Sequence, residues 1–345
     1  MKTMKNSVWR VIEAIAPDLE ELNAALATQE GRIEAREMCP QRNSTPLLSL
    51  LAEDRYFDDP IALALIPFSN CAMADPNGMT PLILAAGQNR SSIVLRALLP
   101  LSDIKARDQQ GRNALEMAIS DGDSRAVRLL LPQSQPALPD ARNRTPLMLA
   151  AHRATVEVLT LLLPLNDACA FDDLGRTALM HAASSLLLGN IEALIPFSDL
   201  HAQDHKGRTA LMHAAATAPD PFHDLFSTEP PTAANNPNFL AVRALVAGSD
   251  MAKTDRDGLT AFEIAAAAHN FHAADFMAPN VEPWRWTRAL KLAGQALGGL
   301  PENAMPRTRA LLEGAAIHSS LSNEAGANPA KRTASAAPIR LARKL

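Results

Sequence analysis

The chain is poor in the residues and runs that identify several protein classes. Aromatic residues make up 4% of its 345 residues, so its core must be built from aliphatic side chains. Its three cysteines are scattered and form no motif, which is typical of a reducing compartment. No stretch of about 20 apolar residues could span a membrane, and no apolar run of signal length follows Met1. We therefore expect a cytoplasmic protein, with export by a route that needs no hydrophobic signal left open.

The chain does contain a sequence motif that is repeated along its length. Its shared pattern is Asp-x-x-Gly, one residue, then Thr-(Pro/Ala)-Leu-x-x-Ala. The copies are Asp75–Ala86, Asp108–Ile119, Asp140–Ala151, Asp172–Ala183, Asp204–Ala215 and Asp255–Ala266. From Thr80 to Thr209 the period is 32 to 33 residues, which predicts a helical solenoid.

The residues of each copy explain the shape locally. Asp and Gly favour a tight turn, since the Asp side chain binds backbone N–H groups and Gly accepts positive φ. The Thr that follows is a helix N-cap, and Pro suits the first helical position. Asn143 stands in one Gly slot, and we predict that it adopts the left-handed conformation. A Leu-Pro or Ile-Pro pair ends the second helix of several copies.

These motifs resemble the ankyrin repeat family over roughly residues 42–278. Asn43–Leu51 looks like a degenerate first copy, which gives about seven repeats. The chain departs from the family pattern at the His that follows Thr-Pro-Leu, where it carries Ile83, Glu116, Met148, Met180, Met212 and Glu263. The resemblance implies an all-α solenoid of stacked helix pairs with β-hairpin or turn fingers between them, and a protein-binding role.

The remaining segments predict caps and a tail. Residues 1–41 look helical and are expected to cap the first repeat, since solenoids need polar caps at their ends. Residues 42–278 form the solenoid, and 279–317 a C-terminal helical cap or an amphipathic segment. Residues 318–345 are rich in Ser, Asn and Ala and contain no aromatic residue, so we predict a disordered basic tail.

Four arginines form a ladder, because they occupy one slot in consecutive repeats: Arg112, Arg144, Arg176 and Arg208. Stacked repeats would place them in a row that could bind an acidic partner, since guanidinium groups suit carboxylates. The alternative is local pairing with the Asp that begins each copy, which would neutralise most of the charge. The net charge of −4 and the lack of interleaved aromatic residues speak against nucleic acid.

An insertion of 18 residues lies within 217–239, between the two helices of one repeat. Insertions in repeats map to loops on one face, which is often the binding face. Phe222, His223 and Phe226 could form an apolar turn for a partner. Alternatively, the phenylalanines fold back onto the solenoid.

Trp284 and Trp286 introduce a basic helical segment at 283–297. Such a helix could lie on an anionic membrane or hold a second partner. We favour the alternative that it covers the apolar end of the last repeat.

Histidines are the remaining place to look for chemistry. His181 and His213 share an otherwise apolar slot in adjacent repeats, but a metal site needs three or four ligands and the repeat register assigns no third. We predict hydrogen-bonded structural histidines, no metal, no cofactor and no catalytic residues, because the common nucleophile, phosphate-binding and zinc motifs are missing.

The sequence therefore predicts a monomeric module or adaptor that binds a protein partner through its concave face, its fingers and the 217–239 loop. The alternative is a regulatory or secreted effector that uses the stack for targeting and its C-terminal segment for a membrane or a second partner.

Overall fold

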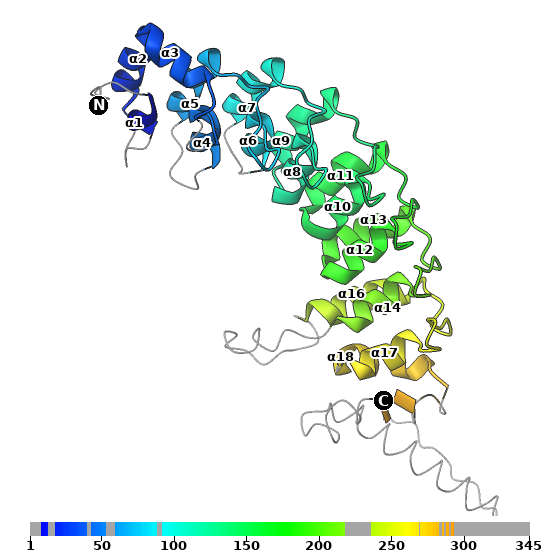
Figure 1. Ribbon diagram of the computed structural model, residues 1–345. Coiled ribbons are helices and arrows are strands. Elements are labelled where there is room, and N and C mark those ends of the chain that lie inside the picture. The colour runs from blue at the N-terminus through cyan, green and yellow to red at the C-terminus, as the bar shows by residue number, and fades with distance from the viewer. Residues whose placement is uncertain are drawn as a thin grey trace, which may run out of the picture.

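Each repeat of the sequence folds into a pair of helices, and the pairs stack one after another along an arc (Figure 1). The computed structural model describes residues 8–12, 18–39, 43–52, 59–87, 92–217, 236–268, 270–282 and five positions between 285 and 292. The first helices of the pairs are α4 (Pro46–Ala52), α6 (Pro81–Ala86), α8 (Ala114–Asp121), α10 (Pro146–Arg153), α12 (Ala178–Ser185), α14 (Ala210–Ala216) and α17 (Ala261–Ala267). The second helices are α5 (Asp59–Leu65), α7 (Ser92–Leu98), α9 (Ser124–Leu130), α11 (Val156–Leu162), α13 (Leu188–Leu194), α16 (Pro237–Val246) and α18 (Phe271–Met277).

Two rows of helices result from this stacking. Each first helix packs against the first helix of the next pair, and each second helix does the same, which gives a first-helix row and a second-helix row. The core between the rows is aliphatic, with Leu82, Leu115, Leu147 and Leu179 at most 1% exposed beside fully buried alanines. Small alanine side chains let neighbouring helices approach closely, so the low aromatic content is sufficient for this fold.

The first helices begin where the sequence predicts. Thr80, Thr145, Thr177, Thr209 and Thr260 are N-caps, and each side-chain oxygen accepts a hydrogen bond from the backbone N–H three residues later. Asn113 does the same for α8. These bonds satisfy donors that the first turn of a helix otherwise leaves without a partner.

The second helices end at the predicted prolines. α5, α7, α11 and α13 stop one residue before a short 3₁₀ turn, and the proline lies in the middle of that turn. The turns are η1 (Ile66–Phe68), η2 (Leu99–Leu101), η4 (Leu163–Leu165) and η5 (Ile195–Phe197), with η3 (Leu131–Gln133) after α9 and η6 (Ala278–Asn280) after α18, while α16 ends without one. Proline lacks the N–H that would continue the α-helix, so the helix ends in a tighter 3₁₀ turn and the chain then becomes extended.

Three short helices precede the first pair: α1 (Val8–Ile12), α2 (Leu19–Ala27) and α3 (Gln29–Arg36). Val8, Val11 and Ile12 are buried, and α1 packs against α2, α3 and α4. Residues 8–36 therefore lie against the first pair, where a cap is expected.

The fingers that join successive pairs are turns. Within the described residues, the structure contains a single antiparallel bridge, between Cys39 and Ser44, and no extended strand. Four of the five neighbouring pairs of fingers between Asp75 and Asp255 are linked by one backbone bond, as from Asp173 N–H to the Arg142 carbonyl at 3.1 Å and from His205 N–H to the Leu174 carbonyl at 2.9 Å. In the part of the chain that is described, no helix is long and apolar enough to cross a bilayer.

Candidate functional site: the finger groove

The carboxylate that begins each finger has two oxygens with separate tasks. Oδ1 accepts the backbone N–H groups two and four residues later, at 2.8–3.0 Å, in the fingers of Asp75, Asp108, Asp140, Asp172, Asp204 and Asp255. These two bonds close the turn and are the same in all six fingers. The second oxygen, Oδ2, is left for another partner, and that partner differs along the stack.

In two fingers the partner of Oδ2 is the arginine of the same finger. Arg112 binds Asp108 through Nε at 2.8 Å and Nη2 at 2.7 Å, and Arg144 binds Asp140 at 2.8 and 2.6 Å. Burial tends to raise the pKa of Asp140, but the bonds from Arg144 and Arg142 outweigh it and hold the pKa below its ordinary value. Local pairing therefore holds these two members of the ladder.

In the next two fingers a histidine takes the place of the arginine. His181 Nε2 lies 2.9 Å from Asp172 Oδ2, and His213 Nε2 lies 3.0 Å from Asp204 Oδ2. Burial lowers the pKa of both histidines and outweighs the attraction of the carboxylates, so each ring is neutral near pH 7. Since a carboxylate can only accept, the Nε2 of each neutral ring carries the proton and donates it.

The arginines of these two fingers extend forward to the next repeat. Arg176 Nε lies 4.0 Å from Asp204 Oδ2, and Arg208 Nε lies 3.5 Å from Asp255 Oδ2. Neither contact is a hydrogen bond, and both Nε atoms are buried without a hydrogen-bond partner. The two side chains are 29% exposed, close to the 33% and 31% of Arg112 and Arg144. The difference between the two pairs of arginines is therefore in pairing and not in exposure.

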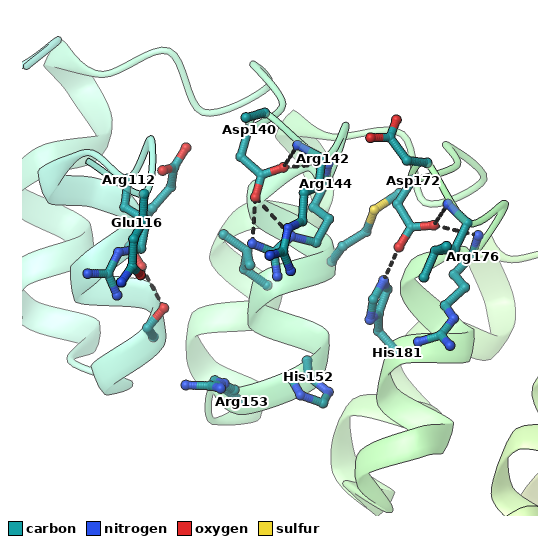
Figure 2. Close-up of a pocket in the computed structure, with 17 residues that line it drawn as sticks. Arg112, Glu116, Asp140, Arg142, Arg144, His152, Arg153, Asp172, Arg176 and His181 are labelled. Atoms are coloured by element: carbon teal, nitrogen blue, oxygen red, sulfur yellow. Dashed lines mark hydrogen bonds and ion pairs between the residues drawn. The ribbon is translucent and has the colours of Figure 1, made fainter. Parts of the chain in front are cut away.

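A groove of about 730 Å³ lies between the fingers and the first-helix row, and we call it the finger groove. Its finger wall includes Gln110, Ala141 and Leu174, and its helix wall is formed by side chains of α8, α10 and α12. Figure 2 shows Arg112, Arg144 and Arg176 along the finger side, with His152 and Arg153 at the far end of α10.

The charges that line the groove do not cancel. Glu116, Asp140 and Asp172 have partners inside the protein, which are Arg107, Arg144 and His181 respectively. Within the described part of the chain, the side chains of Arg142 and Arg153 make no hydrogen bond or ion pair, and Arg176 makes only its long contact. Asp173 is the one carboxylate of the lining whose side chain makes no hydrogen bond or ion pair with the described residues. Because the His181 ring is neutral, Asp172 keeps its charge, so these three cations face two anions and the groove has a positive excess of one charge.

Glu116 forms the buried edge of this groove. It closes a capping box, because Asn113 Oδ1 accepts the Glu116 N–H and the Glu116 carboxylate accepts the Asn113 N–H. Burial raises the pKa of Glu116 and prevails over the opposing effects of Asn113 and Arg107, whose Nη1 is 3.2 Å away. Glu263 closes the equivalent box with Thr260 in α17.

Contacts at the C-terminal end resemble those between repeats. The buried Glu263 carboxylate lies 3.2 Å from Arg285 Nη1 and 3.8 Å from Arg288 Nη1. Arg288 also donates to the carbonyls of Gly258 at 2.9 Å and Asp257 at 3.2 Å. Asp257 occupies the position whose carbonyl, in earlier fingers, accepts the N–H of the next finger. The Arg288 side chain thus takes the place of a further repeat.

The predicted site residues fall into two groups. The four arginines of the ladder are described, and the structure divides them into a locally paired set and a forward-reaching set. Phe222, His223, Phe226, Trp284 and Trp286 lie outside the described residues. Among those described, no group of three or more potential metal ligands comes together.

Several groove residues escape sequence reasoning. Arg142 and Arg153 occupy slots that vary between repeats, so no periodic signal marks them. The capping boxes did have a signal, because Asn113 and Thr260 each precede a Glu by three residues. The His–Asp pairs also had one, since nine residues separate the two partners in both repeats.

Comparison with known proteins agrees with the geometry. Residues 48–140 and 122–201 match the family described as ankyrin repeats (3 copies). No curated protein matches the chain.

Proposed function

Because this chain is an ankyrin repeat protein, we propose that its protein-interaction role consists of binding an acidic segment of a partner protein in the finger groove. The observation that carries the proposal is that Arg142, Arg153 and Arg176 line the groove without a close carboxylate partner and leave it with a positive excess of one charge. A guanidinium group presents several N–H donors in a plane that suits a carboxylate. An acidic segment would supply the missing partners.

The groove favours an extended segment over a single ion. It passes along three first helices, so successive acidic side chains of one peptide can reach different arginines. Stacked helices are separated by about 8–10 Å, and an extended chain covers that distance in about three residues. We therefore expect acidic residues spaced about three apart to bind best.

The 217–239 insertion is proposed as a second contact with the same partner. It leaves the stack at Thr217, directly after the C-terminal end of α14. Arg153, at the C-terminal end of α10, lies at the corresponding end of the finger groove. The Asn238 side chain donates to the Thr217 carbonyl at 2.9 Å and so ties the two ends of the insertion together.

The C-terminal segment is proposed as a cap. The contacts of Arg285 and Arg288 with Glu263 and with the last finger support this role over membrane attachment by residues 283–297. They leave the finger groove as the surface through which the partner is held.

The test uses the full chain and a short fluorescein-labelled peptide in which Glu alternates with two Ser residues. Wild-type protein should raise the anisotropy of this peptide, and the affinity should fall as salt is added. The double variant Arg142→Glu/Arg153→Glu should weaken binding by about tenfold or more, because it reverses two charges that face the ligand.

A matched control reverses two arginines of the second-helix row, Arg96→Glu and Arg125→Glu. Both are exposed on α7 and α9, outside the groove, and the net charge changes equally. Equal loss of affinity in both double variants, or no binding of the acidic peptide by wild type, would overturn the proposal. A peptide with Lys in place of Glu should not bind.

A further inference from the structure

We infer that His181 and His213 determine which arginines of the ladder bind the acidic partner, and that Arg176 and Arg208 are the carboxylate-binding pair. This inference rests on the proposed function and deepens it. In this inference the two buried histidines do not contact the ligand. They decide which arginines are available to bind it.

The first step of the argument is the competition for one oxygen. Asp Oδ1 is occupied by two backbone N–H groups in every finger, so only Oδ2 can hold a side chain strongly. In the Asp140 finger, Arg144 takes Oδ2 through two nitrogens. In the Asp172 finger, His181 takes it at 2.9 Å, and Arg176 is displaced.

The second step is that the occupant of one helix position decides the competition. The position nine residues after the finger Asp holds Met117 in α8, Leu149 in α10, His181 in α12 and His213 in α14. Where the side chain is apolar, the arginine pairs locally; where it is His, the arginine is released. The same rule holds in all four fingers that carry an arginine of the ladder.

The third step is that the released arginines find no equivalent partner. Asp204 Oδ2 already accepts His213, so Arg176 gains only attraction across 4.0 Å. Asp255 Oδ2 lies 3.5 Å from Arg208 Nε without forming a hydrogen bond. No hydrogen bond from the Nη groups of either arginine is present among the described residues, so each can donate two parallel bonds to a carboxylate.

The fourth step is placement. Arg176 lines the finger groove, and Arg208 holds the same slot one repeat further on. Two carboxylates of one extended segment, about three residues apart, match this one-repeat separation. Arg208 therefore lies one repeat beyond the groove lining, and the ligand that we infer is one acidic peptide that reaches both arginines.

The test removes the histidines and leaves every arginine in place. His181→Leu/His213→Leu installs the residue that the chain itself carries at Leu149. Arg176 and Arg208 should return to Asp172 and Asp204, and affinity for the Glu-Ser-Ser peptide should fall about tenfold, although the net charge near pH 7 is unchanged.

The reciprocal variant is Leu149→His. It should take Asp140 Oδ2 from Arg144 and add a third released arginine to the groove, so affinity should rise about threefold. Circular dichroism and thermal unfolding establish that each variant keeps the stack. Because one variant loses affinity and the other gains it, general destabilisation cannot produce both results.

A second measurement separates release of the arginines from any other effect of the histidines. In an Arg176→Ala/Arg208→Ala background, adding the two His→Leu changes should alter the affinity no further, since the residues they act through are gone. A persisting effect in that background overturns the inference, and so does unchanged affinity in the double His→Leu variant when wild type binds. Failure of wild type to bind the peptide overturns the proposed function and this inference together.

Discussion

The fingers of Asp140 and Asp172 share nearly the same sequence pattern but differ in electrostatics. Both close their turn with Oδ1, and both carry an arginine four residues later. In the first, the arginine binds its own carboxylate at 2.6–2.8 Å; in the second, His181 occupies that carboxylate and the arginine points onward. A ladder that is uniform in sequence is therefore not uniform in charge, and counting arginines overstates the positive surface.

Removing the finger carboxylate should have the largest effect on stability, and the effect should differ between the two fingers. Asp140→Ala frees two backbone N–H groups and Arg144, which can turn to solvent, and should destabilise the protein by about 2 kcal/mol. Asp172→Ala also leaves the buried His181 N–H without an acceptor, so the loss should reach about 3–4 kcal/mol. Urea unfolding followed by circular dichroism measures both, and equal losses would contradict the difference between the two fingers.

A second effect appears in the dependence of stability on pH. Burial lowers the pKa of His181 and His213, so the unfolded chain binds more protons than the folded chain as the pH falls below the ordinary value of about 6.5. Stability should be fully present above that value and decline toward the lower folded pKa, by at most about 1.4 kcal/mol per pH unit for each histidine.

Replacing both histidines by Leu should flatten this slope. Thermal unfolding of wild type and of the His181→Leu/His213→Leu variant, in a series of buffers from about pH 5 to 7.5 around the ordinary histidine pKa, gives the comparison. His152 is unchanged in both proteins and serves as an internal control. Its pKa is also lowered, mainly by burial, but its ring bonds the Ser185 hydroxyl and no finger Asp, so it contributes equally to both slopes. An identical slope in wild type and the double variant would show that these two rings do not titrate with unfolding.

The smallest effect concerns the finger of Asp255, which carries Leu259 in place of an arginine and is followed by no further finger among the described residues. Arg288→Ala removes the donor to the Gly258 and Asp257 carbonyls and should cost up to about 1 kcal/mol, because the side chain is 42% exposed. The matched control is Arg256→Ala, which is exposed on the same finger and keeps its backbone bond to Lys206. Differential scanning fluorimetry should show a lower Tm for the first variant only.

The parts of the fold that were predictable from sequence are those held by neighbours in the chain. Asn143 has φ of 58°, as its place in a Gly slot predicts, and the Thr N-caps lie where the pattern puts them. In contrast, the contact that α3 makes with α2 was not predictable, although residues 1–41 looked helical. Its Gly31 lies against α2 so closely that a Cβ would be 2.1 Å from the Ala25 carbonyl oxygen, and this approach is set by how the two helices pack.

The candidate site was predictable only in part. Sequence register identified the ladder from Arg112 to Arg208 and placed His181 and His213 in one slot, but it treated the two sets separately. Arg142 and Arg153 were not predicted, because they vary between repeats and become neighbours of Arg176 only when helices and fingers stack.

By itself, the sequence determined the period, the turns, the caps and the helix ends, because each depends on bonds between residues a few positions apart. The tertiary structure decided which partner holds each finger carboxylate and which arginines remain available. That choice depends on Oδ2 lying within about 3 Å of one donor rather than another, and the donors come from the same finger, from the helix that follows it and from the preceding repeat. Only the stacked structure brings a helix histidine and an arginine of the preceding repeat to one carboxylate, as at Asp204.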